Sequence, residues 1–203
     1  MVDIHHQFWC HSNMAGLKSF LQVAAPVLGV TGAALYERQR ALVGLGALKV
    51  QPGRGPGSGV PFTSENFAAI VVSLLATENL SEVDQRMFSL FDAVPDDINR
   101  YSPDPSEGYP SFLSEVAALL SGKRTTWEAV KAKSSGRYRA LRVSRHWRGQ
   151  IEGTRGAVTY LALDQIDKLY PPIRITAEID GTVISKLIAL TQGALTQVGI
   201  DYE

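Results

Sequence analysis

The sequence predicts a mixed α+β protein, and three observations lead to this class. Apolar residues recur at helical spacing through most of the chain before residue 121. Beyond Gly136 the pattern changes to short segments with strand-like alternation. A last apolar-periodic segment, 183–197, predicts a closing helix. With 203 residues, 45% of them hydrophobic, the chain is long enough for one or two domains with a real core.

The first part of the chain predicts two helices joined by a tight turn. Apolar residues at i, i+3, i+4 spacing from Leu17 indicate an amphipathic helix over 16–28. Gly29 suits a helix-ending turn, and Thr31 suits the N-cap of a second helix over 32–44. In this second helix we expect Leu35, Ala41 and Leu42 to face inward and the following residues to face outward: Ala33, Tyr36, Glu37 and Arg40.

A hairpin and a third helix follow. Short strand candidates at 48–50 and 60–62 flank the segment 51–59, which holds four glycines and two prolines. A glycine- and proline-rich segment between two strands predicts a hairpin. Thr63 can cap the strongly apolar helix that we expect to end near Ala76.

The rest of the chain predicts further helices, a loop and three strands. The expected helices are 80–94, 111–121, 126–133 and, opened by Asp180-Gly181-Thr182, 183–197. Prolines and acidic residues at 95–110 predict a loop and a domain boundary. The expected strands are 137–145, 158–163 and 173–179. The first two strands are separated by what we interpret as a turn region containing Gly149, Gly153 and Gly156.

The order of segments over 16–76 is helix, glycine turn, helix, strand, glycine-rich hairpin, strand, helix. This order resembles the winged helix-turn-helix domain of bacterial DNA-binding regulators. The resemblance depends on the turn, the second helix and the hairpin: Ala25, Gly29-Val30-Thr31, Leu35, residues 38–48, the 52–59 loop and Thr63–Asn66. At one position the chain departs from the pattern. Arg38 stands three residues after Leu35, where an apolar residue that packs on the turn is expected.

The resemblance implies a winged DNA-binding domain (14–78). From the sequence pattern beyond it we expect a helical connector (79–125) and a C-terminal α/β module (126–203) with a short antiparallel sheet. The last unit would serve dimerisation or supply a second DNA-binding surface. A major groove about 12 Å wide admits one helix, and Gly32, Ala33 and Ala34 would allow close approach. From this unit we expect DNA contacts by Thr31, Ala33, Tyr36, Arg38, Arg40, Lys49 and Arg54.

The charge is unevenly distributed although the net charge is zero. Between Glu65 and Glu115 there are ten acidic and two basic residues, a balance of −8; between Lys123 and Arg155 there are ten basic and two acidic, a balance of +8. Aromatic residues interleave with five arginines of the basic segment: Arg137, Arg139, Arg142, Arg145 and Arg148. Three interpretations stay open for these arginines: contact with nucleic acid, contact with an acidic partner surface, or the solvated face of a strand.

The sequence offers little support for an enzyme. It lacks the HExxH, GxSxG, Walker A and GxGxxG patterns. One acidic cluster (Asp92, Asp96, Asp97 and Asp104) lies in or near a proline-rich loop, where acids are usually solvated, so we expect neither a metal site nor a cofactor. The single cysteine, Cys10, excludes an internal disulfide. No apolar segment approaches the roughly 20 residues that cross a bilayer, and a cytoplasmic, nucleoid-associated protein is expected.

The function that the sequence predicts is sequence-specific binding of double-stranded DNA by a transcription regulator, as a homodimer. Transcription machinery is a further candidate partner, and the order of segments has a general likeness to regulators of phage and mobile elements. Two alternatives stay open. One is a phage or recombination accessory or assembly protein that uses the winged domain as a docking scaffold. The other is a metal-dependent nuclease built on scattered acids.

Overall fold

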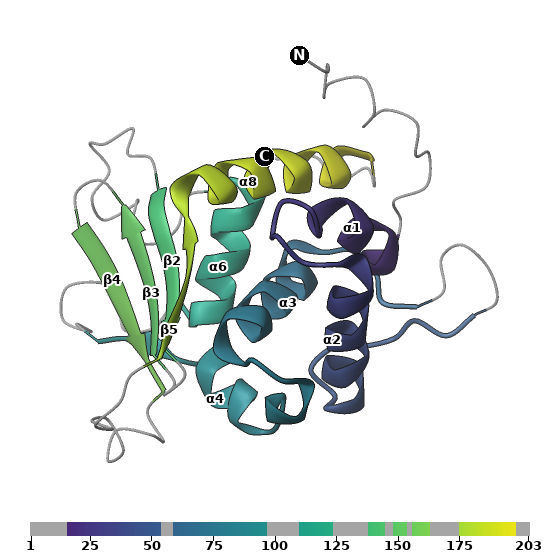
Figure 1. Ribbon diagram of the computed structural model, residues 1–203, viewed down its shortest axis with the longest axis horizontal. Helices are drawn as coiled ribbons and strands as arrows, with labels where there is room; N and C mark the ends of the chain where they lie inside the picture. The colour runs from purple at the N-terminus through teal and green to yellow at the C-terminus, as the bar shows by residue number, and fades with distance from the viewer. Residues whose placement is uncertain are drawn as a thin grey trace.

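The computed structural model describes residues 16–53, 59–96, 110–123, 138–144, 148–153, 156–162 and 175–197. It confirms the mixed α+β class, since these residues form six α-helices, a short 3-10 helix and a five-stranded antiparallel sheet. Figure 1 shows the sheet along one side of the molecule, with α6, α8 and α3 on one of its faces and α1 and α2 farther from it. No helix in the described part of the chain is long and apolar enough to cross a membrane.

Of the three N-terminal helices, the second and third follow the predicted positions closely, whereas the first ends four residues before the predicted end at 28. The three helices are α1 (Leu17–Ala24), α2 (Gly32–Gly44) and α3 (Ser64–Ala76). The hydroxyl of Thr31 accepts from the backbone N–H of Ala34, and that of Thr63 accepts from Asn66 N, so each forms an N-cap. The predicted strands around the hairpin are absent as regular strands. Two isolated bridges take their place, Gln51 with Gly59 and Gly16 with Pro61.

The helix predicted over 80–94 is interrupted. The chain forms a 3-10 turn, η2 (Leu80–Glu82), a short helix, α4 (Arg86–Phe91), and an edge strand, β1 (Val94–Pro95). At the start of α4 the Asp84 carboxylate accepts from the backbone N–H of Arg86, two residues later, at 2.9 Å, which favours a local turn over a continuous helix at this point. The same carboxylate binds the Arg86 side chain, which lowers the pKa of Asp84.

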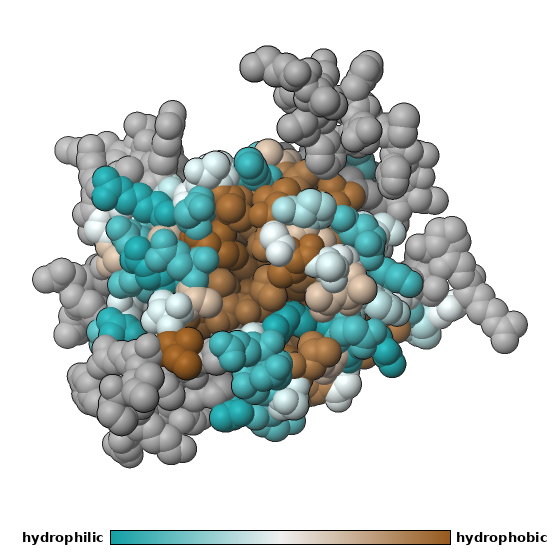
Figure 2. Space-filling model, in the orientation of Figure 1, coloured by the Kyte–Doolittle hydropathy of each residue, from teal (hydrophilic) through white to brown (hydrophobic). Residues whose placement is uncertain are grey.

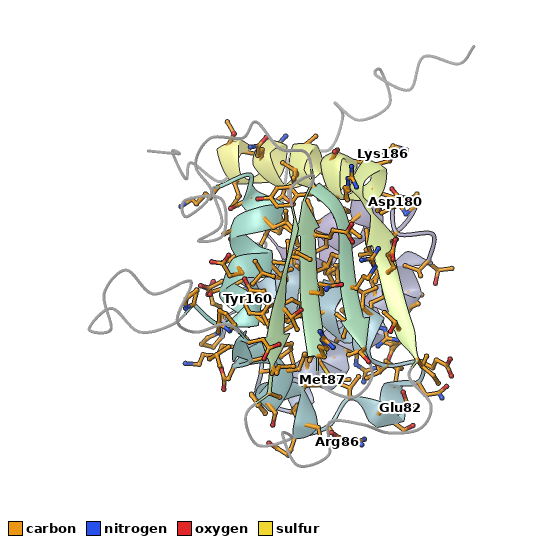
Figure 3. The ribbon with its side chains drawn as sticks, turned by 90° about the vertical axis from the view of Figure 1, so that its left-hand side faces the viewer. Glu82, Arg86, Met87, Tyr160, Asp180 and Lys186 are labelled. Atoms are coloured by element: carbon orange, nitrogen blue, oxygen red, sulfur yellow. The ribbon has the colours of Figure 1, made fainter. Side chains whose placement is uncertain are left out.

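The sheet has the order β1-β4-β3-β2-β5. Besides β1 its strands are β2 (Tyr138–Ser144), β3 (Arg148–Gly153), β4 (Gly156–Leu161) and β5 (Thr176–Asp180). Leu141, Ile151 and Val158 are directly opposite one another in register and buried, so they lie on the face that the helices cover. No helix or strand among the described residues covers the other face, which we call the open sheet face and which carries the alternate residues of each strand (Figure 3).

Strand β3 occupies most of the region predicted as a glycine-rich turn. Gly149 is opposite Val143 on one side and Tyr160 on the other, in the middle of regular pairing. A Cβ at Gly149 would lie 2.4–2.6 Å from atoms of the Phe112 ring. Glycine is therefore present because α6 packs its aromatic ring onto the sheet at this point, and not because the chain turns there.

Two helices complete the cover of the sheet. They are α6 (Phe112–Ser121), as predicted, and α8 (Gly181–Gln197). Asp180 ends β5 and caps α8, since its carboxylate accepts from the backbone N–H groups of Thr182 and Val183. These bonds, that of Val183 first, lower the pKa of Asp180. The helix predicted over 126–133 lies outside the described residues.

One hydrophobic cluster runs through the described parts of all three predicted units. At the N-terminal end the Phe20 ring lies 4.2 Å from the Phe62 ring and 4.8 Å from the Phe67 ring, measured between centroids. At the sheet the centroid of the Phe112 ring lies 5.2 Å from that of Tyr160. The connector contributes both α6 and the edge strand β1, so it is part of the fold that supports the sheet.

Candidate nucleic-acid interface

The turn between α1 and α2 is fixed by the backbone. Gly29 has a φ of +68°, the left-handed conformation that glycine adopts readily. The N–H of Val30 donates to the carbonyl of Ala25, and that of Leu28 donates to Ala24, which closes the end of α1. Thr31 then starts α2 through its cap. These residues thus form a short, defined turn between α1 and α2.

Helix α2 has a buried face and an open face. Its buried residues are Leu35, Arg38, Gln39 and Leu42. On the opposite side, residues at spacings of four, three and four form a stripe that we call the open stripe of α2: Ala33, Glu37, Arg40 and Gly44. Ala33, Arg40 and Gly44 are exposed and Glu37 is partly exposed, and the neighbouring Ala34 and Thr31 are exposed as well.

The expected DNA contact by Arg38, which would need an outward-facing side chain, is contradicted by its burial. The residue is only 6% exposed, and its guanidinium donates to Ser73 O at 3.0 Å, Thr77 Oγ1 at 2.6 Å and Thr77 O at 3.0 Å. These acceptors are at the C-terminal end of α3, where backbone carbonyls lack partners within the helix. Burial lowers the pKa of Arg38, against the opposing charge of Glu82. Arg38 therefore joins α2 to α3 and is not available to DNA.

Two side-chain contacts organise the accessible side of α2. Arg40 Nη1 lies 3.1–3.2 Å from the two carboxylate oxygens of Glu37, and both side chains keep solvent access, 65% for Arg40 and 46% for Glu37. Lys18 of α1 places its Nζ 4.5 Å from the centre of the Tyr36 ring. Lys18 was not among the contacts expected from the sequence. A signal in the sequence could have indicated Lys18. It is on the predicted helix that packs on α2, and Tyr36, which it contacts, lies one helical turn before Arg40.

The residues at the base of the predicted hairpin, Gln51 and Gly59, follow α2 in the sequence and pair with each other. Gln51 and Gly59 exchange backbone hydrogen bonds of 2.8 and 3.1 Å, and Leu17 N donates to Val60 O. The returning segment is thereby attached to the start of α1. Lys49 and Val50 precede this bridge and are exposed. The predicted hairpin arginine, Arg54, lies outside the described residues.

The second predicted surface, on β2 and β3, shows paired charges. Arg142 contacts Glu178 of β5 through Nε at 2.5 Å and Glu152 of β3 through Nη1, and these bonds, that to Glu178 first, raise the pKa of Arg142. Arg148 donates to the Thr159 hydroxyl at 3.3 Å. Arg139 is exposed. The two remaining arginines predicted for this surface, Arg137 and Arg145, lie outside the described residues.

The open sheet face is thus a mixed-charge surface in its described part (Figure 3). Arg142 is opposite Gln150 and Glu178 in register, and Ala140 is opposite Glu152 and Asp180. Arg142 is paired with acids of both neighbouring strands, Glu152 and Glu178, which fits the solvated or acid-paired interpretation of Arg142 better than a phosphate track. Figure 3 also shows Asp180 where β5 meets α8, with Lys186 on the first turns of that helix.

Apolar surface gathers away from the open stripe of α2. In Figure 2 the strongly hydrophobic area lies over α3 and α6, beneath α8, whereas the surface over α2 is paler and more polar. Of the predicted acidic cluster, Asp92 and Asp96 are exposed, and Asp97 and Asp104 lie outside the described residues. Within the described ranges no group of three or more His, Cys, Asp or Glu side chains is placed to hold a metal ion.

No protein-family model, curated protein or solved structure matches this chain. The candidate interface therefore has to be judged on its own geometry.

Proposed function

We propose that this protein is a sequence-specific regulator of transcription that binds double-stranded DNA as a dimer. The contacting unit consists of α1, α2 and the base of the hairpin, with α2 in the major groove. The observation that carries the proposal is the open stripe of α2, which begins with small, exposed residues next to a fixed turn. An α-helix with its side chains is about 10–12 Å across, so it fills a major groove about 12 Å wide.

The N-terminal half of α2 suits close approach to base edges. Ala33 and Ala34 project only methyl groups, and neither is covered by another element. In helix-turn-helix proteins the first residues of the second helix lie deepest in the groove. A longer side chain at these positions would hold the helix away from the bases, whereas alanine lets the backbone and the next turn come near.

Three exposed cations belong to the contacting unit and can contact phosphates. They are Lys18 on α1, Arg40 on α2 and Lys49 before the hairpin bridge. Contacts to phosphates fix the position of a protein on the duplex and make its affinity depend on salt. A dimer places two such units on half-sites roughly 34 Å apart, so that the dimer binds the full site more tightly than either unit binds a half-site alone.

The test is selection of binding sites from a random duplex library with the full-length chain, followed by titration of the selected site. Lys49→Ala is expected to weaken binding about equally for all sequences and to reduce the salt slope by about one unit. Lys123→Ala is the matched control, because Lys123 is exposed after α6 and outside the contacting unit. If the library yields no enriched sequence, or if Lys123→Ala weakens binding as much as Lys49→Ala, the proposal fails.

A further inference from the structure

We infer that the Glu37–Arg40 pair determines the specificity of this interface and reads a C·G base pair in the major groove. The inference rests on the proposed function, because it assumes that α2 lies in the groove. It starts from the composition of the open stripe, which begins with Ala33, ends with Gly44 and carries its only two polar side chains, Glu37 and Arg40, in between.

The position of the pair along the helix brings it to the bases. Glu37 is one turn beyond Ala33, about 6 Å along the helix axis, and Arg40 follows about 4.5 Å later. The small residue before the pair lets this turn approach the groove floor. Because the exposed fractions are 46% for Glu37 and 65% for Arg40, both heads can reach a ligand without a change of the fold.

The pair leaves hydrogen-bonding capacity on both partners. Arg40 contacts Glu37 through one nitrogen, Nη1, whereas a guanidinium carries five N–H donors in a planar fork. Each Glu37 oxygen accepts a hydrogen bond from that one nitrogen and keeps a further lone pair for another donor. The salt bridge therefore orients the two groups side by side, with an acceptor next to a donor.

The chemistry of the groove selects the base pair. Because phosphates repel a carboxylate, Glu37 can form favourable contacts with DNA only through hydrogen-bond donors on base edges. In the major groove these donors are cytosine N4 and adenine N6. The guanine of a C·G pair presents O6 and N7, the acceptors that arginine prefers. One C·G pair therefore satisfies the acceptor of Glu37 and the donors of Arg40 together. An A·T pair also offers a donor, adenine N6, but its acceptors N7 and O4 lie on either side of that donor and do not form the adjacent acceptor pair that arginine binds through two N–H groups.

The experiment compares the sites selected by the natural chain with those selected by Glu37→Gln and Asp92→Asn. Asp92→Asn is the matched control, since it also removes one exposed negative charge but lies at the end of α4. At one C·G position of the selected site, the preference of Glu37→Gln for cytosine is expected to be about tenfold to a hundredfold weaker than that of the natural chain. The variant is expected to prefer adenine there instead, because glutamine binds adenine through N6 and N7. Asp92→Asn is expected to keep the natural site.

Three outcomes are distinguishable. A selected site whose cytosine preference depends on Glu37, with Glu37→Ala losing it as well, supports the inference. A selected site that Glu37→Gln and Glu37→Ala recognise with unchanged base preference overturns it while the proposed function stands, and the pair is then only a surface salt bridge. The absence of any selected site with the natural chain ends both proposals.

Discussion

Replacement of Arg38 tests the most unexpected structural feature, a buried arginine in the middle of α2. Arg38→Ala removes charged hydrogen bonds to Ser73 O, Thr77 Oγ1 and Thr77 O. Ser73 O keeps other donors, because the N–H and the hydroxyl of Thr77 also bond to it. The main loss therefore concerns the two acceptors on Thr77, a residue that is 4% exposed, because the remaining bond of Arg38, to Glu78 O, is longer at 3.4 Å and only partly buried.

The magnitude follows from these two bonds. A hydrogen bond to a charged group contributes about 1.5–3 kcal/mol net, and two of them give about 3–6 kcal/mol. Part of this is offset because the variant no longer has to desolvate a guanidinium. We expect the free energy of unfolding to fall by about 2–4 kcal/mol, which corresponds to a Tm about 4–16 °C lower for a chain of this size. Arg38→Met should lose less than Arg38→Ala, since methionine keeps the apolar stem in place.

The assay is equilibrium unfolding in urea followed by circular dichroism, with Arg40→Ala as the matched control. Arg40 is on the same helix but exposed, and its salt bridge to Glu37 spans one turn of a surface helix. Such pairs contribute less than about 1 kcal/mol. If Arg38→Ala and Arg40→Ala unfold at the same urea concentration, the guanidinium does not hold α2 to α3 and the reasoning is refuted.

Two further predictions concern the sheet and its last helix. Gly149→Ala is expected to destabilise the chain by about 1–3 kcal/mol, because the added methyl group meets the Phe112 ring. Gly193 is a helical glycine with nothing within 4 Å of its Cβ position, so Gly193→Ala should instead stabilise by up to about 1 kcal/mol. Equal effects of the two substitutions on thermal unfolding would contradict this. Asp180→Ala should lower the unfolding midpoint at neutral pH, since the cap of α8 is lost. The folded pKa of Asp180 is lowered, so its contribution is complete above the ordinary Asp pKa of about 3.9 and disappears as the pH falls through the folded value. A difference from the natural chain that stays the same at every acidic pH at which the chain still folds would exclude this role.

The helices that sequence patterns predicted best are those whose signals are local. Thr31 and Thr63 each accept from a backbone N–H three residues later, and the predicted bounds of α2 are those observed. Caps and glycine turns involve neighbouring residues only, so the sequence contains all the information that fixes them. The same holds for Asp180 at the start of α8.

The errors arose where contacts join distant parts of the chain. Gly149 looked like a turn residue because the ring of Phe112, which requires it, is 37 positions earlier in the sequence. Arg38 looked like a DNA contact because its acceptors are on α3. One local signal was available in the second case. Arg38 lies three residues after Leu35 and four before Leu42, both buried, so helical spacing alone places it on the inner face.

The most direct test of the proposed function locates the DNA on the protein surface. Backbone amide signals of the isotope-labelled full-length chain would be followed by NMR during titration with the selected duplex. The account predicts that the largest shifts lie on Thr31–Arg40, with Lys18 and Lys49 affected as well, while β2, β3 and β4 change little. Shifts concentrated on those strands, with α2 unchanged, would contradict it.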